Sequence, residues 1–308
     1  MKRLCRRCLF EEAMDLWLVP EHLPAALLPI TINDDGLCNV CEGYLRDLDE
    51  ALLADEADQL AFDVAASGRP ALLALSGGKD SLATLALCRA RDIDVVAVLY
   101  DNGFVPAPVI ARARAVCDAV SVPFSVIVAD AAEARAIAAA VASPSPSSPA
   151  PCMACARQMG RHFAALCDRL EASWMVSGTN YPAHWQPVDQ EGDDERHRWR
   201  IQASHGLLSP TGRALRLIHL PFALRLTHDG VREALGGLGV DLDDVTRAVG
   251  GISSNCRVPG LVQGPIARAL GHVPEQEDLA LEVLSGHRRR EDAIAELRQK
   301  APGLVRIG

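Results

Sequence analysis

The segment that most constrains this 308-residue chain is a glycine pair between an apolar run and a helix-like segment. Residues 70–74 have the length and apolar character of a buried strand, and residues 82–90 carry apolar side chains at helical spacing. Residues 75–81, with the sequence LSGGKDS, stand between them. Backbone N–H groups at such a turn and helix start can hold an anion. The sequence therefore predicts a phosphate-binding loop within an α/β fold.

The side chains of this loop suit the phosphates of a nucleotide. Lys79 supplies a positive charge, Asp80 can bind Mg²⁺, and Ser76 and Ser81 supply hydroxyl groups. The Walker pattern G-x-x-x-x-G-K-[S/T] is absent, because position 73 is leucine and an aspartate follows the lysine. A glycine turn with a fortuitous lysine is the simpler alternative.

The loop resembles the S-G-G-x-D-S signature of the PP-loop ATP pyrophosphatases, the adenine nucleotide alpha-hydrolase-like superfamily. In that superfamily the loop binds the pyrophosphate of ATP while an acceptor oxygen is adenylated. The resemblance implies catalytic roles for Lys79 and Asp80. It implies that the ATP-binding residues are Ser76, Gly77, Gly78, Lys79, Asp80 and Ser81.

Strand-like and helix-like segments alternate after the loop, which predicts a parallel sheet with right-handed crossovers. The expected strands cover residues 94–100, 124–128 and 174–177, and the expected helices cover 106–120, 131–142 and 152–170. Ligands of such sheets bind beyond the carboxyl ends of the strands. The turns after the second and fourth strands should therefore face the nucleotide, through Asp101, Gly178, Thr179 and Asn180.

Two C-x-x-C pairs lie near the amino terminus, and 29 residues separate them. Each pair lets two thiolates converge from one turn, so Cys5, Cys8, Cys38 and Cys41 predict a closed tetrahedral zinc site. Four sulfur ligands leave no open position, so the zinc should be structural. We expect one short strand at residues 27–32 in this ribbon. Four free thiols are the alternative.

A second cysteine group follows the segment 143–151, which is rich in serine and proline and should form a mobile loop or lid. Cys152 and Cys155 open the next predicted helix, where the helix dipole favours thiolates for metal binding or redox chemistry. Cys256 stands alone, in a polar stretch more than a hundred residues later.

A PP-loop, a C-x-x-C at a helix start and one distant cysteine together are similar to the 2-thiocytidine and archaeal-type 2-thiouridine tRNA synthetases. The resemblance implies that Cys152, Cys155 and Cys256 hold a 4Fe-4S cluster with one open iron, and that Cys152 and Cys155 are catalytic. It implies ATP, Mg²⁺, Zn²⁺ and that cluster as cofactors. The implied reaction adenylates a carbonyl oxygen of a tRNA base or small molecule and replaces it with sulfur. The sulfur donor would be sulfide or a persulfide or thiocarboxylate carrier protein.

The chain departs from those families in two places. Their G-H-x-x-D-D motif after the fourth strand is replaced here by GTNYPA at residues 178–183, and a second ribbon is missing. The segment 33–41, NDDGLCNVC, resembles N-acetyl sugar amidotransferases, which are PP-loop enzymes fed with ammonia by a glutaminase partner. Under that alternative the acceptor is a nucleotide sugar, and Cys152 and Cys155 are incidental. A zinc-dependent scaffold with a vestigial nucleotide site is a third, non-enzymatic alternative.

Composition narrows these alternatives only in part. A net charge of −9 and 4% aromatic residues argue against a broad nucleic-acid surface. No apolar run reaches membrane-spanning length and no signal peptide is evident, so we expect a cytoplasmic protein without a membrane partner, and we allow for a homodimer.

Residues 181–200 should be an active-site loop or a surface excursion. We expect later helices at 229–238, 241–249, 265–270 and 275–300. The predicted division is a zinc ribbon at 1–44, a helical connector at 45–68, the ATP pyrophosphatase core at 69–225 and a helical region at 226–308.

Overall fold

A mostly parallel six-stranded sheet forms the centre of the computed structural model, which describes residues 3–182, 184–188, 198–247 and 253–300. Its strand order is β3-β2-β1-β4-β8-β7. The strands are β1 (Ala71–Ala74), β2 (Val95–Asp101), β3 (Phe124–Val128), β4 (Trp174–Ser177), β7 (Ser204–Leu208) and β8 (Ala214–His219). The first five strands in that order are parallel, and β7 is antiparallel to β8. The predicted α/β class is confirmed.

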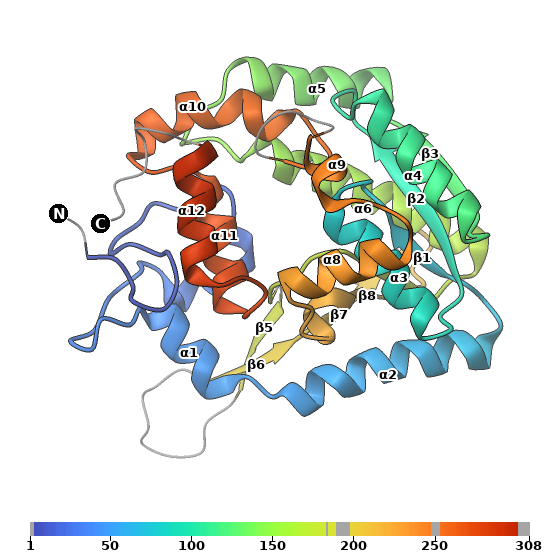
Figure 1. Cartoon of the computed structure of the whole chain (residues 1–308), viewed down its shortest axis with the longest axis horizontal. Helices are drawn as coiled ribbons and strands as arrows, with labels where there is room; N and C mark the ends of the chain where they lie inside the picture. Colours follow the sequence, from blue (N-terminus) through green and yellow to red (C-terminus); the bar gives the residue numbers. More distant parts are fainter. Residues whose placement is uncertain (1–2, 183, 189–197, 248–252, 301–308) are drawn as a thin grey trace.

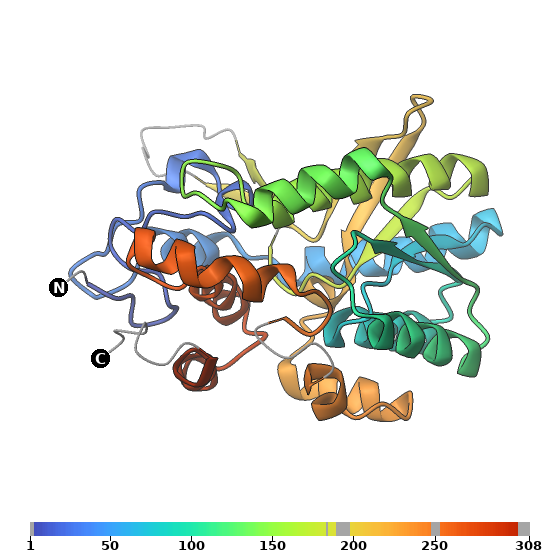
Figure 2. The ribbon, with the colours of Figure 1, turned by 90° about the horizontal axis from the view of Figure 1, so that it is seen from above.

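The central strands are apolar on both faces because helices cover both. Leu73, Leu99 and Val176 lie in the cluster packed by α3 (Lys79–Ala90) and α4 (Ala107–Ala119). Their neighbours Leu72 and Val98 face α6 (Pro151–Leu170) in a second cluster. This alternation is the period of two that a pleated strand imposes. A capping box of Asp130 and Glu133 begins α5 (Ala131–Ala142). Figure 2 shows these helices layered on the two sides of the sheet.

The carboxyl-terminal region is helical, as expected, but it is divided differently. The helices are α7 (Leu220–Ala223), α8 (His228–Gly237), α9 (Leu242–Arg247), α10 (Val258–Leu270), α11 (Glu275–Leu284) and α12 (Arg290–Lys300). The expected single helix over 275–300 is wrong, because the chain turns at Gly286, where φ is +78°. The expected start of a helix at Pro265 is also wrong, because that proline lies inside α10. Part of the expected helix 241–249 lies outside the described residues.

The amino-terminal region contains two 3-10 helices (Pro20–His22 and Ala25–Leu27), α1 (Asn39–Asp47) and α2 (Glu50–Ser67). The strand expected at 27–32 is wrong, since only an isolated bridge between Ile32 and Cys38 forms there. Three prolines between 20 and 29 limit ladder hydrogen bonding. Part of the stretch 181–200 pairs as a hairpin of β5 (His184–Pro187) and β6 (Trp199–Gln202), and residues 183 and 189–197 lie outside the described residues.

Helices α11 and α12 lie directly beside the amino-terminal region (Figures 1 and 2). The Glu277 carboxylate, which is 0% exposed, accepts hydrogen bonds from the backbone N–H groups of Trp17, Leu18 and Val19. Arg290 Nε donates to the Cys8 carbonyl over 3.1 Å. Segments some 260 to 280 positions apart in the sequence are thereby joined.

The serine- and proline-rich segment before α6 is held by one buried side chain. Trp17 Nε1 donates to the carbonyls of Ser145 and Ser148 over 3.1 and 2.8 Å. The segment is therefore attached to the amino-terminal region through Trp17, whereas the sequence predicted a mobile loop or lid. Over the part of the chain that the structure describes, we find no helix whose length and apolar content suffice to span a membrane.

Candidate functional site

The glycine loop forms the tight turn between β1 and α3 that the sequence predicts. Gly77 has φ of +77°, and a Cβ there would lie 2.7 Å from Val109 Cγ1. From the neighbouring strand β4, Gly178 comes so close that a Cβ on it would lie 2.9 Å from the Ser81 backbone nitrogen. Both glycines are required by close approach of the backbone. The turns after β1 and β4 therefore touch at the carboxyl edge of the sheet.

The start of α3 offers hydrogen-bond donors for an anion. Gly78 is the N-cap residue and provides no side-chain cap, so the first N–H groups of the helix are not satisfied by a cap. The Ser76 hydroxyl lies 3.1 Å from that of Ser81, which itself donates to the Gly78 carbonyl. Ser254 Oγ, from the segment before α10, lies 3.4 Å from the Lys79 backbone nitrogen. These groups surround the position that a phosphate would take.

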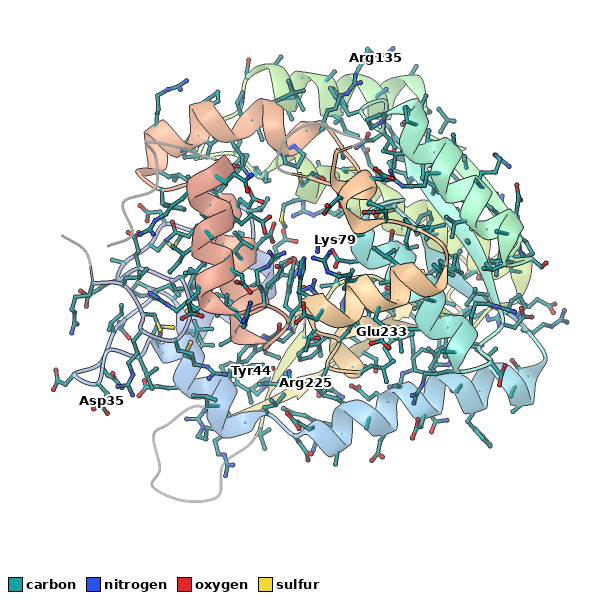
Figure 3. The ribbon with its side chains drawn as sticks, in the orientation of Figure 1. Asp35, Tyr44, Lys79, Arg135, Arg225 and Glu233 are labelled. Atoms are coloured by element: carbon teal, nitrogen blue, oxygen red, sulfur yellow. The ribbon has the colours of Figure 1, made fainter. Side chains whose placement is uncertain are left out.

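The charged side chains of the loop face acids and bases of the carboxyl-terminal helices. Lys79 Nζ contacts both Asp80 carboxylate oxygens at 2.7 Å, and it lies between the start of α3 and α11 (Figure 3). Burial alone would lower the pKa of Lys79, but the carboxylates of Asp80 and Glu282 outweigh burial and raise it. Lys79 therefore stays charged. Asp80 also lies 3.8 Å from His287 Nε2.

Sequence reasoning missed the contribution of α11. Glu282 accepts a hydrogen bond from Arg288 Nε over 2.7 Å and one from Asn180 Nδ2 over 3.4 Å. Burial would raise the pKa of Glu282, but Lys79 and Arg288 hold it at about 2. Asp278, one helical turn earlier, accepts from the Tyr181 hydroxyl over 3.3 Å. Burial and the nearby Glu282 raise the pKa of Asp278 to about 8. The acids facing the loop therefore come from α11 and not from the turn after β4.

Two of the three later cysteines meet at one asparagine, and the third lies near them. Asn102 follows β2, is buried, and its Nδ2 contacts Cys155 Sγ at 3.3 Å and Cys256 Sγ at 3.6 Å. Cys152 is close enough to both thiols for their charges to raise its pKa. Asp101, which the sequence favoured at this turn, instead accepts from the Gly103 N–H. The residue that reaches the cysteines is therefore Asn102.

The expectation that the helix dipole makes these thiols acidic is wrong. Burial, followed by the charge of Cys256, raises the pKa of Cys152 to about 12. Burial also raises the pKa of Cys155, against the hydrogen bond from Asn102 that lowers it. All three cysteines pack beside the apolar cluster of Trp17, Ile137 and Val258. Desolvation therefore exceeds the helix-dipole effect at this position.

The four amino-terminal cysteines form a separate compact group. Their sulfurs all lie within 4.8 Å of one another and are buried, with Cys5 to Cys41 at 3.8 Å and Cys8 to Cys38 at 3.7 Å. A tetrahedral ion with bonds of 2.3 Å places its sulfur ligands about 3.8 Å apart. Among the described residues, no other group of His, Cys, Asp or Glu is as compact. The four thiols therefore fit a single tetrahedral metal ion.

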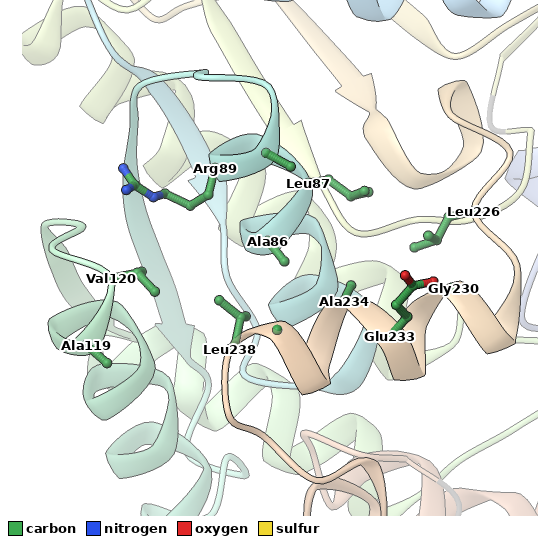
Figure 4. A pocket seen from close by; sticks show the side chains of 12 residues that line it. Ala86, Leu87, Arg89, Ala119, Val120, Leu226, Gly230, Glu233, Ala234 and Leu238 are labelled. Atoms are coloured by element: carbon green, nitrogen blue, oxygen red, sulfur yellow. The ribbon is translucent and has the colours of Figure 1, made fainter.

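The remaining predicted residues lie at the same sheet edge. Asn180 is buried, with an Oδ1 atom that has no hydrogen-bond partner, and Thr179 Oγ1 accepts from Ser177 Oγ over 3.3 Å. A cavity of about 620 Å³ lies elsewhere, between α3, α4 and α8 (Figure 4). Leu87, Val120 and Leu238 contribute to its lining. It is at the far end of α3 from the glycine loop, so it does not belong to this site.

Comparisons with known proteins identify no family for this chain. No protein-family model matches the chain, and no curated protein matches it. A solved structure, NMN synthetase from Francisella tularensis, is similar with a TM-score of 0.40 and 13% sequence identity, over 85% of this chain and 98% of that chain. A likeness at this level does not assign a function. The residues of the site carry the functional argument.

Proposed function

We propose that this chain is an ATP-dependent sulfur transferase of the PP-loop ATP pyrophosphatase type. The observation that carries the proposal is the contact of Asn102 with both Cys155 and Cys256, next to a loop that suits phosphate. Cys256 follows Ser254 and Asn255, and a Cβ on Gly78 would lie 2.8 Å from Ser254 Oγ and 3.2 Å from Asn255 Cβ. The segment 254–256 therefore borders both the glycine loop and the cysteine group. Thiolation at an adenylated carbon needs a nucleotide site and a sulfur site that lie side by side.

ATP would bind with its phosphates at the start of α3. The backbone N–H groups and the hydroxyls of Ser76 and Ser81 would hold the phosphate oxygens, and Lys79 would offset the charge that develops on pyrophosphate. Asp80 supplies a carboxylate for Mg²⁺, which prefers oxygen ligands. Gly178 must stay small, because any side chain would meet the Ser81 backbone.

The reaction then consists of two substitutions. The carbonyl oxygen of the acceptor attacks the α-phosphorus, the phosphorus–oxygen bond to pyrophosphate breaks, and an adenylate forms. Hydrosulfide attacks the activated carbon, the bond from that carbon to the AMP oxygen breaks, and a proton is released. Asp278 accepts a hydrogen bond from Tyr181 and is close enough to raise the pKa of Cys152, and with its own pKa at about 8 it would be the group that gives up or takes up a proton near neutral pH.

The donor sets fit the metals that this function implies. The amino-terminal sulfurs have the spacing of a structural zinc site. The other three thiols are spread more widely, as ligands to different irons of a 4Fe-4S cluster are. Such a cluster, when bound by Cys152, Cys155 and Cys256, would supply an open iron for sulfide. The acceptor, either a tRNA base or a small molecule, and the cytoplasmic location are part of the proposal.

Anaerobic purification with iron, sulfide and zinc analysis tests the proposal. We expect about four irons and four sulfides per chain beside one zinc, with visible absorption from iron–sulfur charge transfer. Cys256→Ala should lose the iron and keep the zinc. The matched control is Cys117→Ala, a buried cysteine of α4 far from the site, which should keep both.

Zinc without iron after reconstitution would contradict the sulfur-transfer proposal. The apolar packing of the three thiols would then be their main role, as the amidotransferase alternative requires. ATP binding tests the PP-loop assignment separately from sulfur transfer, because the sulfur-transferase and the amidotransferase alternatives both need ATP. Failure of wild-type protein to bind ATP with Mg²⁺ would refute the PP-loop assignment itself.

A further inference from the structure

Four of the nine histidines gather on the opposite side of β4 from the glycine loop. The rings of His184 on β5 and His205 on β7 have centroids 5.4 Å apart, and His205 lies 6.0 Å from His219 at the end of β8. His22 is close enough to influence the pKa of His219 and contacts the Tyr181 ring. Four separate segments of the chain therefore bring imidazoles together.

The ring nitrogens of this cluster are available to a ligand. His219 is 6% exposed, and its Nδ1 is paired with Ser177 Oγ at 2.5 Å. Its Nε2 has no hydrogen-bond partner although it is buried, and the same holds for Nδ1 of His205. A buried polar atom without a partner is costly. When Nδ1–H donates to Ser177, Nε2 keeps its lone pair, and that arrangement is common for metal-bound histidine.

Three imidazoles of this cluster, those of His22, His205 and His219, have a lowered pKa and are held in the neutral form that binds metal. Burial, with smaller effects from His205, lowers the pKa of His219 to about 3. Burial lowers the pKa of His205 and of His22 as well. A cluster of neutral imidazoles does not attract anions through charge, so it favours a cation that accepts nitrogen lone pairs.

We propose that His184, His205 and His219 bind a divalent transition-metal ion, with His22 as a further nitrogen donor nearby. Bonds of 2.0–2.1 Å to three tetrahedrally placed imidazole nitrogens put ring centres about 5 Å apart. The observed separations of 5.4 and 6.0 Å exceed this only slightly. The His184 and His205 rings stack at an interplanar angle of 20°, and the ring nitrogens do not converge to within 4.8 Å. Binding therefore requires rotation of these two rings, while the bond to Ser177 keeps His219 in place. This site does not depend on the proposed sulfur transfer.

The test is cobalt binding to full-length protein loaded with one equivalent of zinc, which is enough for the four amino-terminal cysteines and leaves a histidine site open. Isothermal titration should show one additional cobalt ion per chain, and X-ray absorption at the cobalt edge should show nitrogen and oxygen ligands without sulfur. His205→Gln should weaken that affinity at least about tenfold, as loss of a ligand or of its support does. His219→Gln should do the same. His162→Gln is the matched control, because His162 lies on α6 against Glu133 and should leave cobalt binding unchanged.

Three results would overturn the proposal. They are no cobalt uptake by wild type loaded with one equivalent of zinc, sulfur in the cobalt coordination shell, or equal affinity in wild type and His205→Gln. His205 is only partly buried, so this variant keeps the test valid even where replacement of the buried His219 disturbs folding. Circular dichroism of each variant before titration shows that the folded protein is being compared.

Discussion

Glu277→Ala should destabilise the protein more than any surface change in α11 or α12. The Glu277 carboxylate is fully buried and accepts three backbone N–H groups, at 3.0 Å from Trp17, 2.7 Å from Leu18 and 3.1 Å from Val19. It also lies 3.0 Å from His272 Nε2. Alanine leaves those donors without an acceptor. Unsatisfied buried groups of this kind cost about 3–5 kcal/mol in total, once partial rehydration is included.

The assay is thermal unfolding with zinc in excess, followed by tryptophan fluorescence and circular dichroism. For a chain of this length, that loss lowers the unfolding midpoint by about 5–8 °C. Trp17 is 4% exposed and adjoins Glu277, so local loosening should appear in fluorescence first. Glu277→Gln keeps an acceptor oxygen and should lose less. Glu291→Ala, an exposed acid of α12, is the control and should change stability by less than about 0.5 kcal/mol. Equal midpoints for Glu277→Ala and Glu291→Ala would refute the reasoning.

Three further predictions concern the site and its supports. Glu282 has a pKa of about 2 in the folded protein against an ordinary value of 4.5, so its stabilisation is present above pH 4.5 and is lost as the pH falls toward 2. The difference in unfolding free energy between wild type and Glu282→Gln, measured by urea unfolding, should therefore close over that range. Gly178→Ala should weaken ATP binding at least about tenfold by calorimetry, because its Cβ meets the Ser81 backbone, whereas Gly160→Ala, with open space around it, should not. Cys38→Ser should release the amino-terminal metal and increase protease cleavage before residue 48. The same cleavage fragments from the variant and from wild type would contradict the structural role of the metal.

The sequence predicted the strands and helices around the loop closely, because their apolar periods and glycine turns are local signals. Strands β7 and β8 were missed although a signal was present. Residues 209–212, Ser-Pro-Thr-Gly, have the composition of a tight turn, and Gly212 N–H bonds the Ser209 carbonyl over 2.9 Å. Apolar β8 residues such as Leu215 and Ile218 follow that turn and are buried.

The candidate site was predicted where its residues lie on the sheet edge and in the group of Cys152, Cys155 and Cys256, and its other residues were missed. Asp278 and Glu282 stand in an acidic stretch that resembles a solvated helix surface. Only the folded chain brings Glu282 to Lys79 and Asp278 to Tyr181. Asn102 was seen as part of a turn, and no local pattern could reveal its distant partner Cys256. These contacts are set by tertiary packing, which a single sequence does not encode at fixed spacing.

The bonds between α11 and the amino-terminal region also set the order in which the protein can be completed. Residues 17–19 and the carbonyl of Cys8 find their partners in Glu277 and Arg290, which leave the ribosome after the whole sheet has been made. Residues 17–19 therefore lack these partners until α11 has been made. Until then the backbone N–H groups of residues 17–19 stay hydrated, and the glycine loop lacks Glu282 and Arg288. Nascent chains that end before α11 should consequently neither retain ATP nor resist proteases at the amino-terminal region, even with metal bound.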